Sequence, residues 1–328
     1  MLTTSRAPAA AGEKSISVHV GNFIRAETDR YFARFVKHGA FGRLSHLRAM
    51  TPIDEQPIVR MNRDTLYSTG VFDLEAAPLT VTLPDPGNAF MSMQVVSQDH
   101  FTTEVVYAPG RFHYTKGGVG TRYVFLMVRV LATANDLRPA HRLQDSIRIS
   151  QASRGAFAVP NWDRASLDVV RSGLEALGSA GGTSVMFGSK EDVDPVSHLI
   201  GTAIGWGGNP RTAALYQSVF PKDNDGVTAH TLTVKDVPVE GFWSISVYNA
   251  SGYFEKNALG AYCVNSLTTH PGPDGSVTVR FGGCQPETEH CLPIVPGWNY
   301  TVRMYRPGKA LLDGSWTFPE AGPVRKSN

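Results

Sequence analysis

The sequence lacks features that would point to two large classes of protein. It has no basic surplus, since 31 Lys and Arg stand against 29 Asp and Glu, whereas a nucleic-acid binder that neutralises phosphates needs a clustered excess. It has no run of about 18 apolar residues, so we expect no membrane-spanning helix. Charged residues make up only 18% of the chain, below the roughly 25% typical of soluble domains. We therefore expect neither nucleic acid nor a membrane as a partner.

Motifs for common nucleophiles and cofactors are also missing. The sequence contains no G-x-S-x-G, H-E-x-x-H or P-loop pattern, which disfavours an α/β-hydrolase in particular. The glycine-rich stretch at 201–208 lacks G-x-G-x-x-G spacing and follows a predicted helix rather than a strand. The sequence therefore predicts no cofactor.

Turn-forming residues, in contrast, are abundant. The chain has 32 glycines and 21 prolines among 328 residues, which favours many short strands joined by turns. Strands are expected in two groups: 79–83, 90–97, 102–107 and 121–131, then 228–234, 242–248, 261–266, 276–281 and 299–305. We predict a β-rich α+β fold in which a β-sheet or barrel comes first and a jelly-roll-like β-sandwich comes last.

Helical patterns precede the first group of strands and separate it from the second. An amphipathic helix is expected over 17–38, and further helices over 139–149, 163–177, from Asp194 onward and over 213–219. Asp163 and Asp194 are predicted to cap the helices that follow them. The predicted layout is a disordered leader (1–16), a helix-plus-β domain (17–134), a helical connector (135–220) and the sandwich (221–328).

The first helix and the leader bear on assembly and localisation. The apolar content of the helix predicts a homo-oligomer interface. The first fifteen residues contain no apolar core segment, so they form either a disordered leader or the remainder of a trimmed precursor. The protein would be periplasmic in the second case and cytoplasmic in the first.

The three cysteines give a further indication of compartment. Cys284 and Cys291 lie in one loop with six residues between them, where a disulfide could close the loop and would imply an oxidising compartment. Two free thiols, or a metal site with His290, are the alternatives, although the spacing is not that of common zinc sites. Cys263 alternates like a strand residue and is expected to be a buried, inert thiol.

Several segments together resemble a known bacterial family. They are NRDTLYS (62–68), GTRYVFLMVRVL (120–131), GFWSISVYNASGYF (241–254), NYTVRMYRP (299–307) and LLDGSWTFP (311–319). The set resembles the tandem of two domains of unknown function, DUF1254 followed by DUF1214, over roughly 17–324. The resemblance implies a jelly-roll-like C-terminal domain and frequent export, and some members carry hydrolase labels. Many relatives have N-W-L-P where this chain reads His290-Cys291-Leu292-Pro293, so no role of that Trp transfers here.

Residues 62–68 hold the densest group of polar side chains beside a predicted strand. Arg63 could clamp a carboxylate or sulfate with Asn62 beside it, Asp64 could act as acid or base, and Tyr67 could donate a proton. The structural alternative is an Arg–Asp pair with a Tyr hydroxyl that ties a strand to a helix.

Other candidates lie farther along the chain. Asp99 and His100 end a predicted strand and could contribute acid/base groups or two metal ligands, or could form a solvated turn. Arg129 follows an apolar run and needs a partner, either in an ion pair with Asp64 or Asp99 or as an anion-binding group. Trp206 lies between glycines that offer little local packing, so it could face a ligand.

Two functions follow as hypotheses. The first is a hydrolase or lyase that acts on a small-molecule or glycan-type substrate through carboxylate acid/base chemistry. The second is a non-catalytic ligand-binding or assembly protein with an aromatic and arginine-lined cleft between domains. The first predicts that Asp64 has a shifted pKa and faces a cavity, and the second predicts that Asp64 is paired with an arginine and sealed in.

Overall fold

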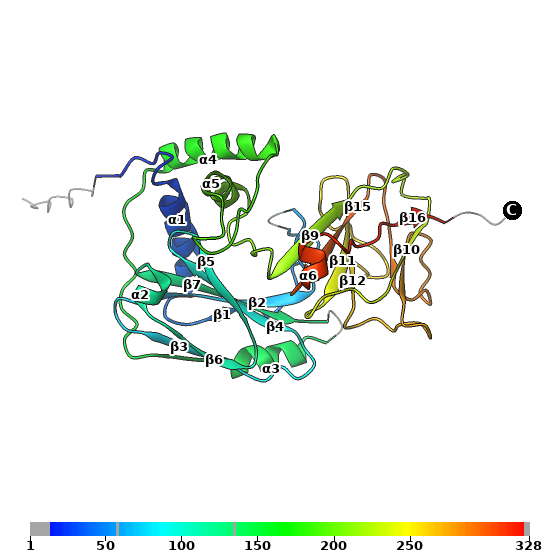
Figure 1. Cartoon of the computed structure of the whole chain (residues 1–328), viewed down its shortest axis with the longest axis horizontal. Helices are drawn as coiled ribbons and strands as arrows, with labels where there is room; N and C mark the ends of the chain where they lie inside the picture. The colour runs from blue at the N-terminus through cyan, green and yellow to red at the C-terminus, as the bar shows by residue number, and fades with distance from the viewer. Residues whose placement is uncertain (1–13, 57–58, 134–135, 325–328) are drawn as a thin grey trace, which may run out of the picture.

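The computed structural model describes residues 14–56, 59–133 and 136–324, which form the β-rich α+β fold that the sequence predicts (Figure 1). An N-terminal half built on α1 and two sheets lies beside a C-terminal half built on two further sheets. Most of the predicted leader lies outside the described residues.

The N-terminal half is organised around a five-stranded antiparallel sheet in the order β1-β2-β7-β4-β5. Its strands are β1 (Ser45–His46), β2 (Thr65–Asp73), β4 (Met91–Ser97), β5 (Thr102–Tyr107) and β7 (Tyr123–Leu131). Successive side chains of a strand point to opposite faces. Val71 and Phe125 therefore join one core beneath α1 (Phe23–Lys37), and Phe72 and Val124 join another on the opposite face.

That opposite face is covered by a small sheet and a helix. The small sheet has the order β6-β3-β8 and consists of β3 (Leu79–Leu83), β6 (Gly110–Tyr114) and β8 (Arg148–Gln151). The helix α3 (Arg138–Ser146) contacts β7. The strand β8 begins where the sequence pattern predicted the last helical turn, because its residues pair with β3. The single turn of α2 (Lys116–Val119) joins β6 to β7.

Two capped helices pack against α1. These are α4 (Arg164–Ser179) and α5 (Pro195–Ile204), and they lie together near α1 (Figure 1). As predicted, Asp163 and Asp194 cap them by accepting from the backbone N–H of Ser166 and Ser197, each at 2.8 Å. The apolar face of α1 is thus packed within the chain, which removes the reason for placing an oligomer interface there.

The C-terminal half is a β-sandwich. One sheet has the order β12-β11-β15-β9 and the other β14-β13-β10-β16, and side chains of both meet in one core. The strands are β9 (Ala214–Val219), β10 (His230–Val234), β11 (Trp243–Tyr248), β12 (Cys263–Asn265), β13 (Val277–Phe281), β14 (Cys291–Leu292), β15 (Asn299–Tyr305) and β16 (Gly322–Pro323). A short helix, α6 (Lys309–Leu312), follows β15.

The strand β9 corrects the prediction of a fourth connector helix over 213–219. These residues pair with β15 in antiparallel register from Val219 opposite Tyr300 to Ala214 opposite Tyr305. Over so short a stretch the sequence pattern does not distinguish a helix from a strand. Backbone pairing with the edge of β15 makes these residues a strand. The C-terminal sandwich therefore begins earlier than expected, and its edge strand faces the N-terminal half.

Candidate functional site

A cleft of about 450 Å³ lies between the two halves of the molecule. One wall comes from β2, β7 and the segment before β2, and the other comes from β9 and β15. The lining residues are Arg60, Met61, Asn62, Tyr67, Met127, Arg129, Trp206, Gly207, Asn209, Tyr216, Ser218, Thr301, Arg303 and Tyr305.

Each wall of the cleft presents a cross-strand pair of an arginine and a tyrosine. In the N-terminal sheet, Tyr67 of β2 stands opposite Arg129 of β7. In the sandwich, Tyr216 of β9 stands opposite Arg303 of β15. Directly opposed residues of antiparallel strands project to the same face, so both members of each pair reach the cleft.

The polar lining from β15 follows from strand alternation. Thr301, Arg303 and Tyr305 occupy every second position and line the cleft. The intervening side chains of Tyr300, Val302 and Met304 fill the core of the sandwich. The alternation in YTVRMY predicts the strand and its two faces, but it does not indicate that the polar face opens onto a cleft.

The guanidinium of Arg129 is buried without a counter-charge. Arg129 is 6% exposed, its Nη2 donates to Gln94 Oε1 at 3.0 Å, and its Nη1 has no hydrogen-bond partner. Its central carbon lies 5.6 Å from the ring centre of Tyr67. The predicted ion pair with Asp64 or Asp99 is wrong, because no carboxylate of the described residues is within ion-pair distance of Arg129.

Two further guanidinium groups line the cleft, Arg303 from β15 and Arg60 from the segment before β2. Arg303 is 4% exposed and donates to Ser246 Oγ at 2.9 Å, to Tyr248 Oη at 2.7 Å and to the carbonyl oxygen of Arg60 at 2.8 Å. Burial lowers the pKa of Arg60, and the positive charge of Arg303 lowers it further. The Arg60 Nη1 donates to Asn299 Oδ1 at 2.6 Å. These contacts satisfy donors, and neither guanidinium forms an ion pair with a carboxylate of the described residues.

Asn62 binds two tyrosines of opposite walls. Its two Nδ2 hydrogens are shared among Tyr305 Oη at 3.0 Å, Thr65 Oγ1 at 3.0 Å and Tyr67 Oη at 3.2 Å, and its Oδ1 accepts from the backbone N–H of Asp64. Asn209 donates in the same way to Tyr216 Oη at 2.7 Å. Each tyrosine oxygen is thus an acceptor that keeps its own O–H for a further partner. Within the described part of the chain, no acceptor for these three protons is found.

Asp64 does not open onto the cleft. It is completely buried, its Oδ2 accepts from Ser244 Oγ at 2.6 Å, and its Oδ1 has no partner. Burial raises the pKa of Asp64, although the charge of Arg303 and the Ser244 hydrogen bond act in the opposite direction. Asp64 therefore joins the two halves of the chain from a sealed position, and the geometry gives it no route to a substrate.

Neither Asp99 nor His100 lines the cleft, although His100 packs behind two of its lining residues, Trp206 and Gly207. Asp99 forms an ion pair with Arg25 at 2.6 Å. His100 is 2% exposed rather than in a solvated turn, its Nδ1 contacts Thr202 Oγ1 at 2.8 Å, and its Nε2 accepts from the backbone N–H of Gly207 at 2.8 Å. Burial, with the neighbouring His198, lowers the pKa of His100 to about 3. The predicted catalytic residues Asp64, Tyr67, Asp99 and His100 are thus not brought together.

Arg63 is not part of the cleft lining. Its guanidinium donates to the carbonyl oxygen of Thr51 and lies 5.1 Å from the ring centre of Tyr262. It therefore fastens the segment before β2 to the sandwich and does not clamp a ligand.

Trp206 lines the cleft, and its ring also packs against a part of the chain far from its own loop. Its ring stacks on Tyr31 of α1 at 4.4 Å between ring centres, and its Nε1 donates to Thr28 Oγ1 at 3.2 Å. Local sequence could not reveal this packing, because α1 is far away in the chain. A sugar-stacking role for this face of the indole is therefore excluded by Tyr31.

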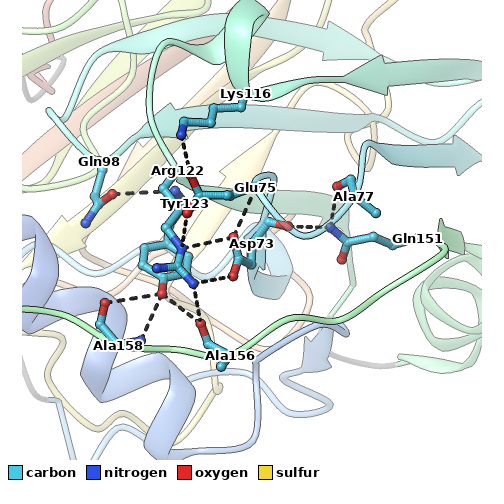
Figure 2. Close-up of polar contacts among 10 residues, drawn as sticks. All are labelled: Asp73, Glu75, Ala77, Gln98, Lys116, Arg122, Tyr123, Gln151, Ala156 and Ala158. Carbon is cyan, nitrogen blue, oxygen red and sulfur yellow. Dashed lines mark hydrogen bonds and ion pairs between the residues drawn. The ribbon is translucent and has the colours of Figure 1, made fainter.

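The other arginine of the segment around β7 has a purely structural role. Arg122 donates to both carboxylate oxygens of Asp73, at 3.1 and 2.8 Å, as Figure 2 shows. The adjacent Tyr123 hydroxyl bonds the backbone of Ala156 and Ala158, which anchors the chain that leads to α4 (Figure 2). Of these two arginines, Arg122 therefore forms an ion pair and Arg129 does not.

Of the alternatives considered for Cys284 and Cys291, the structure confirms the disulfide. Cys284 and Cys291 form a disulfide in the loop between β13 and β14. Cys263 is free, and burial raises the pKa of its thiol well above the usual value. His290 accepts from the backbone N–H of His270, and the described residues contain no group of three metal-ligating side chains.

With the fold and cleft described, two family models match the chain. Residues 41–119 match the protein of unknown function DUF1254, and residues 221–309 match the protein of unknown function DUF1214. The order and the positions are those expected from the sequence segments. The chain therefore belongs to the family defined by this tandem of domains.

Solved structures share the fold. The VPA0106 protein from Vibrio parahaemolyticus is similar with a TM-score of 0.71 and 17% identity, over 93% of this chain and 98% of that one. An uncharacterised protein from Burkholderia cenocepacia is similar with a TM-score of 0.52 and 13% identity, over 93% and 87%. No curated protein matches the sequence. In the described residues, no helix combines the length and apolarity that crossing a bilayer requires.

Proposed function

We propose that this protein binds a small molecule in the cleft between its two halves. The observation that supports the proposal is the cleft of about 450 Å³, to which each half supplies one buried arginine, Arg129 and Arg303, and at least one tyrosine. Its volume is within the range of small-molecule sites, and such sites often lie where two domains meet.

The lining favours binding over catalysis. The described lining residues include no carboxyl group and no imidazole, which are the usual acid/base groups of hydrolases and lyases. Asp64 is sealed, and the Nε2 of His100 already accepts a backbone hydrogen bond. Of the predicted catalytic residues only Tyr67 lines the cleft, so a hydrolase or lyase mechanism based on them has no carboxyl or imidazole group in contact with it.

Another hollow is larger but is a poorer candidate. It measures about 620 Å³ and lies against Cys263 and Cys291. Its described lining contains no arginine, lysine or carboxyl group. It therefore lacks charged groups that would orient a polar ligand.

The proposal is tested by filling the cleft. Ser218 is exposed on β9 and lines the cleft, so Ser218→Trp should occupy the space without disturbing the core. Thr233→Trp, on an exposed site of β10 in the other sheet, is the matched control. We expect thermal-shift screening with anionic, neutral and cationic small molecules to find compounds that stabilise the wild type and Thr233→Trp, but not Ser218→Trp. Stabilisation that is equal in all three proteins, or absent for every charge class, would overturn the proposal.

A further inference from the structure

The arginines of the cleft present positive charge that the described part of the chain does not neutralise. Arg60, Arg129 and Arg303 line one cleft, and none of them forms an ion pair with a described carboxylate. Buried charges in proteins are normally paired, because removing an ion from water is costly. Burial acts to lower the pKa of Arg303, but the charges of Tyr248, Tyr305 and Asp64 raise it, so Asp64 balances part of the charge of Arg303 without forming an ion pair with it.

The cleft also has more free hydrogen-bond donors than free acceptors. The hydroxyls of Tyr67, Tyr216 and Tyr305 accept from amide groups and keep their protons available. Burial raises the pKa of Tyr305, so its hydroxyl stays a donor. The Nη1 of Arg129 also has no partner, and it lies almost wholly beneath the surface of the cleft. A ligand that fits this lining must supply acceptors.

We propose that the ligand carries a carboxylate, held by the arginines and tyrosine hydroxyls, and an apolar body that lies against Met61, Met127 and Trp206. The planar oxygens of a carboxylate accept from guanidinium N–H and phenolic O–H groups in their own plane. The thioethers and the indole edge provide an apolar surface in the same cleft. This assignment rests on the proposed binding function of the cleft.

Three probes that differ only in their polar group test whether the cleft recognises a carboxylate. We would titrate the full chain calorimetrically with 2-naphthoate, the neutral 2-naphthamide and 2-naphthyl phosphate, which share one apolar body. We expect the carboxylate to bind at least about tenfold more tightly than the amide, which corresponds to about 1.4 kcal/mol. Added salt should weaken the binding of the carboxylate and leave that of the amide nearly unchanged.

Variants place the effect in the cleft. Arg129→Gln should abolish the preference for carboxylate over amide. Arg164→Gln removes one positive charge from an exposed site on α4, where Arg164 pairs with Asp168, and should leave the preference intact. If Arg129→Gln does not fold, Tyr67→Phe and Tyr216→Phe keep the rings and remove only the donors. Each should reduce the preference severalfold.

The outcomes separate this inference from the binding function. Equal binding of carboxylate and amide, lost in Ser218→Trp, would overturn the carboxylate assignment and leave the binding function standing. Tighter binding of the phosphate than of the carboxylate would overturn it in favour of a phosphoryl group. If no probe binds the wild type, or if Ser218→Trp binds all probes equally well, both proposals fail.

Discussion

The side-chain amide of Asn62 donates to the hydroxyl of Tyr305 over 3.0 Å and so joins the segment before β2 to the sandwich. The same amide group also binds Tyr67, and its oxygen accepts from the backbone N–H of Asp64. The side chain of Asn62 therefore links the two walls of the cleft.

This arrangement predicts the effect of removing the amide. Asn62→Ala should lower the free energy of unfolding by about 1–3 kcal/mol, because it leaves the Asp64 N–H without its acceptor and breaks the bond between the halves. Asn209→Ala removes an exposed bond to Tyr216 and should cost less than about 0.5 kcal/mol. Urea unfolding measures both, and an equal cost would contradict the role of Asn62.

The lowered pKa of His100 predicts that the folded protein loses stability in acid. Its pKa is lowered to about 3 in the folded protein from 6.5, so the unfolded chain takes up a proton first as the pH falls. Stability from neutral His100 is complete above pH 6.5 and is lost at up to about 1.4 kcal/mol per pH unit toward pH 3.

The variant His100→Asn should lack this component, and asparagine tolerates the left-handed backbone of this position, where φ is 63°. His113→Asn, at an exposed site of β6, is the control and should keep the wild-type dependence. Urea unfolding between pH 4.5 and pH 7 compares the three proteins. If the slope of His100→Asn matches that of the wild type, this role of His100 is wrong.

Asp64 predicts a pH dependence of the opposite sign. Because its pKa is raised in the folded state above 3.8, the folded protein holds this proton more tightly than the unfolded chain. Its contribution is complete below pH 3.8 and falls as the pH rises through the folded pKa.

We therefore expect the stability of the wild type relative to Asp64→Asn to decrease between pH 4 and pH 8, by up to about 1.4 kcal/mol per pH unit within the titration window. Denaturant unfolding of both proteins across this range provides the measurement. An increase of this relative stability with pH would instead mean that Arg303 stabilises an ionised Asp64. That result would contradict the prediction and would favour an Arg–Asp pair, the structural alternative considered for Asp64.

The disulfide predicts a defined contribution to stability. Cys284 and Cys291 are separated by seven positions, and closing so short a loop contributes about 2.5 kcal/mol in the chain-entropy account. The double variant Cys284→Ser, Cys291→Ser should lose that amount in denaturant unfolding. Reduction of the wild type should cause the same loss and should not change the double variant. Reduction that leaves the stability of the wild type unchanged would contradict the prediction.

Local patterns in the sequence were sufficient for much of the fold. The alternation over 79–83, 102–107 and 299–305 predicted β3, β5 and β15 with their observed bounds. Asp163 and Asp194 marked the starts of α4 and α5, because a cap needs only the next three residues. The disulfide was predictable for the same reason, since its loop is short.

The candidate site was only partly predictable. Asn62, Tyr67, Arg129 and Trp206 were singled out from the sequence and line the cleft, whereas Arg63 and Asp64 do not. The residues from the opposite wall, Tyr216 and Arg303 among them, were missed. The sequence pattern of β9, which holds Tyr216, resembles a helix. The pattern of β15, which holds Arg303, resembles that of any strand of a β-sandwich.

The sequence by itself determined the class of fold, the helix caps and the loop disulfide, because each depends on residues that are neighbours in the chain. Only the tertiary structure decided which polar side chains face water-accessible space. It placed β9 against β15, sealed Asp64 beneath Ser244 and set Arg129 across a cleft from Arg303. Burial and charge pairing depend on residues far apart in sequence, and periodicity along one strand carries no information about what lies opposite.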